Sequence, residues 1–272
     1  FIHNLPAAQD LLATASEGNT MCLVSGRVEP VARLHPVIKG VMGAQTAGAS
    51  LVAFNARAYE SHGKTQGDNA PVSEAAAFAY GTALNALLAR DSANHLRIGG
   101  DTLVFWADET AAEDVFLAAF GDAEGEGEKE LRQRLIAVAE GRARPDNALD
   151  PATRLFVLGL APNAARLAVR YWHPGTLGDF ARAVTRFWQE CAIHPSPFVK
   201  GGIDLPPRPW ALLYDTAAQG KADNIPNGLG GDLMRAILTG QRYPQTLLAT
   251  LIGRLRVEGE PDRAKRGNLD GR

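Results

Sequence analysis

The pattern of apolar and polar positions predicts strands in the first two thirds of the chain and helices at its end. Strand-like apolar stretches bounded by glycine, proline or asparagine occur at 21–25, 49–54, 95–107, 154–160 and 165–172. The 95–107 stretch has a Gly-Gly pair at its centre and is predicted to be a hairpin. Helical spacing of apolar residues predicts helices at 7–17, 73–90, 109–120, 128–140, 177–192, 210–219, 230–239 and 243–257.

These elements predict an α+β fold: a mixed α/β core with antiparallel hairpins, followed by a helical C-terminal portion. The expected boundaries are a mixed α/β domain at 1–194, a proline-rich linker at 195–209, a helical portion at 210–258 and a disordered tail at 259–272. Alternation along the 165–172 strand predicts Arg166 and Arg170 on one face, with Leu167 and Val169 on the other.

The composition is typical of a globular protein. The chain has 272 residues, of which 46% are hydrophobic and 21% are charged, and no apolar run reaches the length of a membrane helix. Its first residues show no signal-peptide pattern. The two cysteines, Cys22 and Cys191, have no metal-type spacing and favour a reducing compartment. We therefore expect a cytoplasmic protein without a membrane partner.

Charge is unevenly distributed along the chain. Residues 107–150 contain 12 acidic and 5 basic residues, a local charge of −7 within a total of −2, which leaves +5 on the remainder. A basic remainder beside an acidic segment is compatible with a nucleic-acid-binding face but does not establish one.

A glycine-rich polar stretch at 32–74 interrupts the regular patterning. Its five glycines permit positive φ or close approach of another backbone. Between them lie single polar side chains able to contact phosphate or base edges: Arg33, His35, Lys39, Gln45, Ser50, Asn55, Lys64, Gln66 and Asn69. The residues alone leave two interpretations open. The stretch is either a set of loops that display these side chains or a structural loop whose amides cap turns.

A resemblance to a known family starts in this stretch. Residues 35–88 (HPVIKGVMGAQTAGASLVAFNARAYESHGKTQGDNAPVSEAAAFAYGTALNALL) resemble the signature of the large subunit of the type I-C CRISPR surveillance complex, Cascade. Residues 156–172 (FVLGLAPNAARLAVRYW) and 234–252 (MRAILTGQRYPQTLLATLI) are similar to the next two blocks of that family, in the same order. Members of the family are substantially longer, which implies that this chain is an interior fragment.

The resemblance implies a non-catalytic DNA-binding subunit. Such a subunit recognises the PAM, the short sequence that flanks the target, in double-stranded DNA; it also supports the R-loop and recruits the helicase-nuclease. The implied partners are target DNA, guide RNA through other subunits, the Cascade backbone and small subunits, and the helicase-nuclease. The resemblance also implies that the 32–74 stretch lies near the PAM duplex. Arg166 and Arg170 are either contacts to a nucleic-acid backbone or solvated residues of an exposed strand face.

Signals for catalysis are weak, and we expect no catalytic residue, metal or cofactor. The six histidines are scattered without ligand spacing, and the glycine pairs match no nucleotide-binding motif. The main alternative is a magnesium-dependent nucleic-acid hydrolase using Asp101, Asp108 or Glu109. A second alternative is a purely structural assembly subunit.

Overall fold

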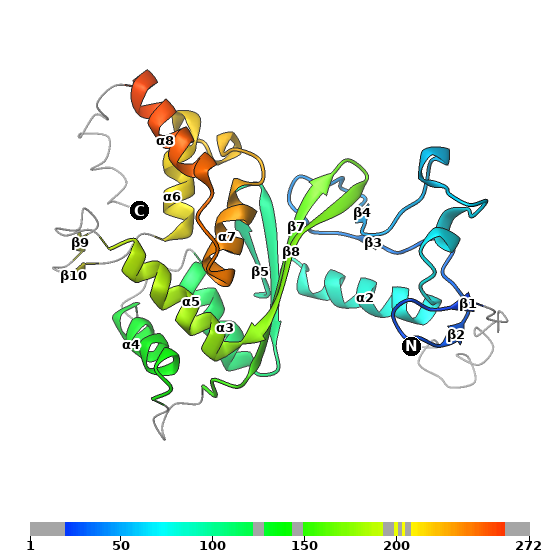
Figure 1. Cartoon of the computed structure of the whole chain (residues 1–272), viewed down its shortest axis with the longest axis horizontal. Coiled ribbons are helices and arrows are strands. Elements are labelled where there is room, and N and C mark those ends of the chain that lie inside the picture. Colours follow the sequence, from blue (N-terminus) through cyan, green and yellow to red (C-terminus); the bar gives the residue numbers. More distant parts are fainter. Residues whose placement is uncertain are drawn as a thin grey trace.

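The computed structural model describes residues 20–121, 128–142, 149–192, 199–200, 203–204 and 208–258. Figure 1 shows two lobes: a larger one built on a twisted sheet with helices on one face, and a smaller N-terminal one. Helix α2 (Glu74–Leu87) and the hairpin of β7 (Arg154–Asn163) and β8 (Arg166–Thr176) reach from the sheet toward the smaller lobe. The helix expected at 7–17 and the tail expected at 259–272 lie outside the described residues.

The central sheet has six strands in the order β3-β4-β8-β7-β6-β5. Its strands are β3 (Val37–Ile38), β4 (Ala49–Ser50), β5 (His95–Ile98), β6 (Asp101–Ala107), β7 (Arg154–Asn163) and β8 (Arg166–Thr176). All neighbours are antiparallel except β4 and β8, which are parallel. The ladder between β7 and β8 shifts register where Gly159 pairs with Tyr171 and Leu160 with Val169. Arg170 is therefore the extra residue of a β-bulge.

Two hydrophobic clusters lie on opposite faces of this sheet because strand side chains alternate. On one face, Leu103 and Phe105 are fully buried beneath the helices. These are α3 (Thr110–Phe120), α4 (Glu128–Ala139), α5 (Leu177–Glu190), α6 (Pro209–Thr216) and α7 (Leu229–Thr239). On the other face, Val104 and Leu160 pack with Leu84 of α2. The main core therefore lies between the sheet and the helices.

Caps define where the helices start. Ser73 precedes α2, and its hydroxyl accepts a hydrogen bond from the amide of Ala76 at 3.2 Å. Thr176 and Asp179 form a reciprocal capping box at the start of α5. Helix α7 approaches the turn between β5 and β6 closely, since a Cβ on Gly230 would lie only 2.1 Å from the carbonyl oxygen of Ile98. Only glycine fits there.

The remaining elements are short, except for the last helix. The smaller lobe contains β1 (Thr20–Met21), β2 (Val28–Glu29) and the 3-10 turns η2 (Arg57–Tyr59) and η3 (Gln66–Asn69). The larger lobe ends with η4 (Ala218–Gly220), η5 (Ala222–Asn224) and α8 (Gln245–Glu258), and a small antiparallel pair joins β9 (Val199–Lys200) to β10 (Ile203–Asp204). This pair falls within the segment expected to be a linker.

The structure confirms the α+β class with antiparallel hairpins and C-terminal helices. Two expected strands are much shorter than predicted. The strand expected at 49–54 ends at Ser50, and the one expected at 21–25 ends at Met21. In the second case the chain turns because the Cys22 sulfur accepts the amides of Val24 and Ser25, each at 3.4 Å. The domain boundaries stay a prediction.

Candidate nucleic-acid interface

The 32–74 stretch is anchored on the tip of the β7–β8 hairpin. The amide of Ser50 donates to the carbonyl of Ala165 at 3.2 Å, and Ser50 pairs in register with Arg166. Gly43, with φ of 74°, lies against the ring of Pro162, where an added Cβ would approach to 3.2 Å. The hairpin tip therefore fixes the position of the glycine-rich loops.

Three of the predicted contact residues bind other parts of the chain. The Arg33 guanidinium donates to the Gln66 side-chain oxygen at 2.8 Å, which joins two predicted residues to each other. The Nδ1 of His35 lies 2.7 Å from the Tyr80 hydroxyl on α2. Burial lowers the pKa of His35, so the ring is neutral at neutral pH. These side chains brace the loops from within.

Asn69 also has a structural role. Its side-chain oxygen accepts the amide of Ser61 at 3.1 Å, and its side-chain nitrogen donates to the carbonyls of Lys64 at 3.2 Å and Gln66 at 3.1 Å. Three bonds from one amide close the turn between Ser61 and Asn69, as expected for an asparagine that substitutes for backbone partners. For Asn69 the turn-capping interpretation is the one that its contacts support.

Four other predicted residues have exposed side chains: Lys39, Gln45, Asn55 and Lys64. Among the described residues, the hydrogen bonds of three of them use the backbone alone. The amide of Lys39 donates to the side-chain oxygen of Asn85, the carbonyl of Gln45 accepts from Gly48, and the amide of Lys64 donates to Ser61. These bonds hold the main chain and leave the side chains directed to solvent.

Sequence reasoning missed two residues of this region. Arg57 is exposed in η2, and Asn85 on α2 fixes β3 through the amide of Lys39 at 2.9 Å and the carbonyl of Val37 at 3.0 Å. Arg57 carried the same signal as the predicted residues, a single basic side chain inside the glycine-rich stretch. Asn85 carried none, because its partners lie 46 and 48 residues away.

The two predicted arginines of β8 have different partners. The Arg166 guanidinium donates to the Tyr59 hydroxyl at 2.9 Å and lies 4.3 Å from the centroid of that ring. The Nε of Arg170 lies 3.7 Å from the Asp101 carboxylate. Leu167 packs on the opposite face, in the cluster with Leu160, as the alternation predicted.

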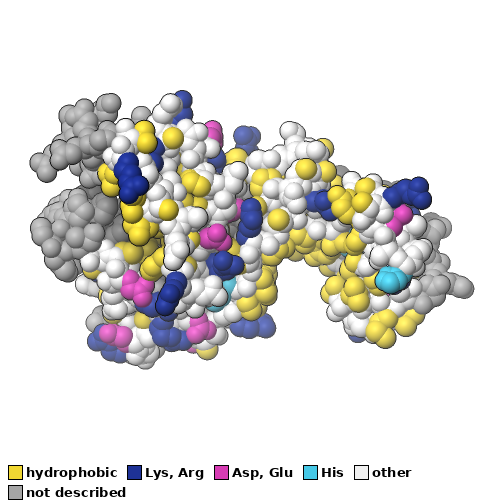
Figure 2. Space-filling model, turned by 45° about the horizontal axis from the view of Figure 1, so that its top comes forward, with side chains coloured by type: hydrophobic (Ala, Val, Ile, Leu, Met, Phe, Trp, Pro, Cys, Tyr) yellow, Lys and Arg dark blue, Asp and Glu magenta, His cyan; other side chains and the backbone are white. Residues whose placement is uncertain are grey.

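The open part of the sheet face carries an aromatic group. Trp172 is 48% exposed, and its ring centroid lies 5.4 Å from that of Trp106 and 5.8 Å from that of Phe156. The neighbouring Tyr171 is buried on the other face. Figure 2 shows hydrophobic side chains gathered on the connection between the lobes, with Lys and Arg spread over both lobes.

Of the acidic residues of the hydrolase alternative, Asp101 begins β6, whereas Asp108 and Glu109 follow the other end of that strand. Asp101 is 1% exposed and accepts the amide of Gly231 at 2.7 Å; burial raises its pKa, against the lowering effect of that amide. Asp108 binds Arg154 at 2.7 Å, and Glu109 precedes α3 without accepting a capping bond. Within the described ranges, no group of three His, Cys, Asp or Glu residues is placed to hold a metal ion.

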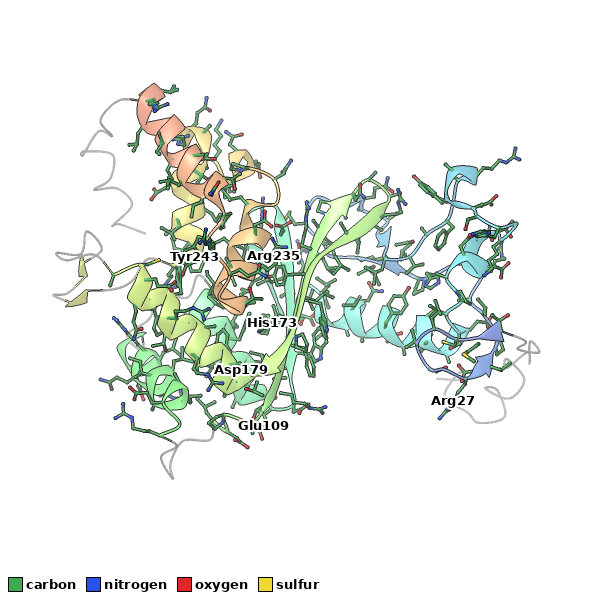
Figure 3. The ribbon with its side chains drawn as sticks, in the orientation of Figure 1. Arg27, Glu109, His173, Asp179, Arg235 and Tyr243 are labelled. Carbon is green, nitrogen blue, oxygen red and sulfur yellow. The ribbon has the colours of Figure 1, made fainter. Side chains whose placement is uncertain are left out.

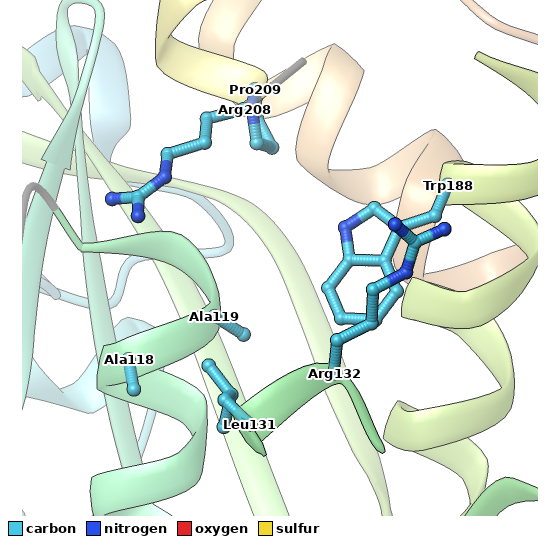
Figure 4. A pocket seen from close by; sticks show the side chains of 7 residues that line it. All are labelled: Ala118, Ala119, Leu131, Arg132, Trp188, Arg208 and Pro209. Atoms are coloured by element: carbon cyan, nitrogen blue, oxygen red, sulfur yellow. The ribbon is translucent and has the colours of Figure 1, made fainter. Parts of the chain in front are cut away.

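Other features of the larger lobe lie on its helical side. Figure 4 shows a pocket between α3, α4, α5 and the start of α6, where Arg132 lies 5.6 Å from the Trp188 ring centroid. Arg208, which also lines it, donates to the Gly121 carbonyl at 2.8 Å. Figure 3 places His173 and Asp179 on the larger lobe, far from Arg27 in the smaller one. Neither the pocket nor the pair of His173 and Asp179 lies next to the 32–74 stretch.

The fold and site together define an α+β protein with polar, glycine-rich loops braced on a long hairpin. A family model described as CRISPR-associated protein (Cas_Csd1) matches residues 1–267, and the chain belongs to this family. No curated protein matches the chain. Membership supports a Cascade-related role in a CRISPR system, in association with other Cas subunits. Among the described helices, none is long and apolar enough to cross a bilayer.

Proposed function

We propose that the chain acts as the non-catalytic large subunit of a type I-C Cascade complex and recognises the PAM of double-stranded DNA through the 32–74 stretch. In this role it supports R-loop formation and recruits the helicase-nuclease. Base pairing with the guide reads most of the target, while the protein reads a short flanking motif and the backbone. Membership in the Cas_Csd1 family supports the CRISPR part of this proposal.

One observation carries the DNA-binding part. Lys39, Gln45, Asn55 and Lys64 stay exposed although their neighbours in the same stretch are bound internally. Cations suit phosphate contacts, whereas amides can form paired hydrogen bonds to base edges. The stretch therefore offers both kinds of contact on a main chain that internal bonds already hold.

The test is a binding measurement on the assembled, guide-loaded complex. Target duplexes that differ only in the flanking trinucleotide are titrated at several salt concentrations, with Lys39, Gln45, Asn55 and Lys64 each changed to Ala. Losing a lysine that contacts phosphate should flatten the slope of log K against log salt by about 0.9. Losing a base-reading amide should change the preference among flanking sequences by about 1–3 kcal/mol.

Matched controls come from the larger lobe. Lys221 precedes η5 and Gln189 lies near the end of α5, both with exposed side chains. Lys221→Ala and Gln189→Ala should leave slope and preference unchanged. If all four interface variants match these controls, the 32–74 stretch is not the DNA-contacting surface.

A further inference from the structure

One side-chain pair joins the hairpin tip to the loop that carries the exposed residues. Tyr59 lies in η2, between Asn55 and Lys64, and Arg166 begins β8 just after the hairpin turn. The guanidinium donates to the Tyr59 hydroxyl at 2.9 Å and lies 4.3 Å from the ring centroid. This geometry combines a hydrogen bond with a cation–π contact. It uses both a donor and one face of the guanidinium.

The backbone on both sides of this pair is strained. His62 and Gln66 in the loop have φ of 51° and 43°, and Ala164 in the hairpin turn has φ of 53°. These left-handed conformations cost energy for residues with a side chain and persist only where the surroundings hold them. The three bonds of Asn69 hold the turn between Ser61 and Asn69, and the bond from Ser50 to Ala165 anchors the chain before Tyr59 on the hairpin. Between these two fixed points, the segment that carries Tyr59 meets the hairpin at Arg166.

We infer that Arg166 is a positioning residue: by binding Tyr59 it holds the loop in the conformation that presents Asn55 and Lys64, and it is not itself a phosphate contact. The inference rests on the proposed function for its DNA readout. Its basis is that the two described contacts of the guanidinium, a hydrogen bond and a ring contact, are both made to Tyr59. Without the pair, the loop must be ordered when DNA binds, and the apparent affinity falls with the fraction of molecules already ordered.

Binding of the assembled complex to a guide-matched duplex distinguishes the two roles. For a positioning residue, Arg166→Ala should weaken binding about fivefold to tenfold, with the salt slope kept. Arg166→Lys should fail to restore affinity, because lysine keeps the charge but lacks the planar group that stacks on tyrosine. Tyr59→Ala should match Arg166→Ala, the double variant should be no weaker than either, and Tyr59→Phe should lose less.

Lys64→Ala and Arg182→Ala are the comparison variants. Lys64→Ala should lower the salt slope by about 0.9, as a phosphate contact does. Arg182 pairs with Asp179 on α5, on the helical side, and its loss should change nothing. The inference is overturned if Arg166→Ala lowers the slope as Lys64→Ala does, if Arg166→Lys restores affinity, or if the losses from Arg166 and Tyr59 add.

A measurement without DNA separates this inference from the proposed function. Trypsin cleaves after Arg57 and Lys64, which are both exposed in the loop. Cleavage there in the assembled complex should be several times faster for Arg166→Ala and Tyr59→Ala than for wild type or Arg182→Ala. Faster cleavage in a complex that shows no DNA contact through the loop would keep the positioning role and end the proposed function. Unchanged cleavage would overturn the positioning role.

Discussion

Replacing Gly230 by Ala should destabilise the larger lobe through one steric contact. A Cβ at this position would lie 2.1 Å from the Ile98 carbonyl oxygen and 2.8 Å from its carbonyl carbon, whereas an ordinary contact begins at 3.4 Å. The start of α7 must therefore retreat from the β5–β6 turn by about 1.3 Å. The same movement lengthens the 2.7 Å hydrogen bond from the Gly231 amide to Asp101, which is buried beside it.

The magnitude follows from these two losses. Overpacking costs about 1–3 kcal/mol, and a hydrogen bond to a charged group contributes about 1.5–3 kcal/mol. Alanine returns up to about 1 kcal/mol through its higher helix propensity. The net loss of unfolding free energy should be about 1.5–6 kcal/mol, which corresponds to a fall in Tm of roughly 3–10 °C for a protein of this size.

Thermal unfolding followed by circular dichroism, with a urea titration on the same samples, measures this change. Gly253→Ala is the matched control, because Gly253 lies in α8 and a Cβ there would meet no atom within 4 Å. The control should gain up to about 1 kcal/mol of stability. If Gly230→Ala is as stable as wild type, or gains stability as the control does, the inferred steric contact between α7 and the β5–β6 turn is refuted.

Two further predictions concern pH. Burial raises the pKa of Asp101, so the contribution of this residue to stability is greatest below pH 3.8, its ordinary pKa, and declines as pH rises through the folded pKa. The urea midpoints of Asp101→Asn should lack that decline. If the variant and the wild type show the same pH dependence, burial does not shift the ionisation of Asp101. The Thr176 hydroxyl lowers the pKa of Asp179, so the capping box stabilises the fold above pH 3.8 and loses this effect as pH falls through the folded pKa. Asp179→Asn should therefore cost about 0.5–2 kcal/mol at neutral pH and nothing in strong acid, and a cost independent of pH would contradict the assignment.

Local patterns were sufficient to predict most elements of the larger lobe. The hairpin at 95–107 combined alternating apolar residues with a Gly-Gly turn, and β5 and β6 occupy that range. The apolar spacing at 177–192 predicted α5, which spans Leu177–Glu190. The bulge at Arg170 was not predictable, because the sequence around it alternates in the same way whether or not one residue is left unpaired.

The predicted strand at 49–54 failed for a different reason. A strand needs partners, and only Ala49 and Ser50 have them, opposite β3 and beside β8. Partner availability is a property of the tertiary fold, which local alternation does not encode. The same limit applies to side-chain roles, since Arg33 and Gln66 are 33 residues apart and His35 and Tyr80 are 45 apart.

The division of roles within the 32–74 stretch has a physical cause. Loops without a hydrogen-bonded ladder leave backbone amides and carbonyls unpaired, and short polar side chains nearby satisfy them. Asn69 makes three such bonds and Asn85 two, so a high density of amides in a glycine-rich stretch overstates the number available for a ligand. Lysine has no acceptor and a long solvated stem, so it is the side chain left outside. In the proposed function, phosphate contacts therefore belong to Lys39 and Lys64, and base reading is confined to the two amides that the loop did not use.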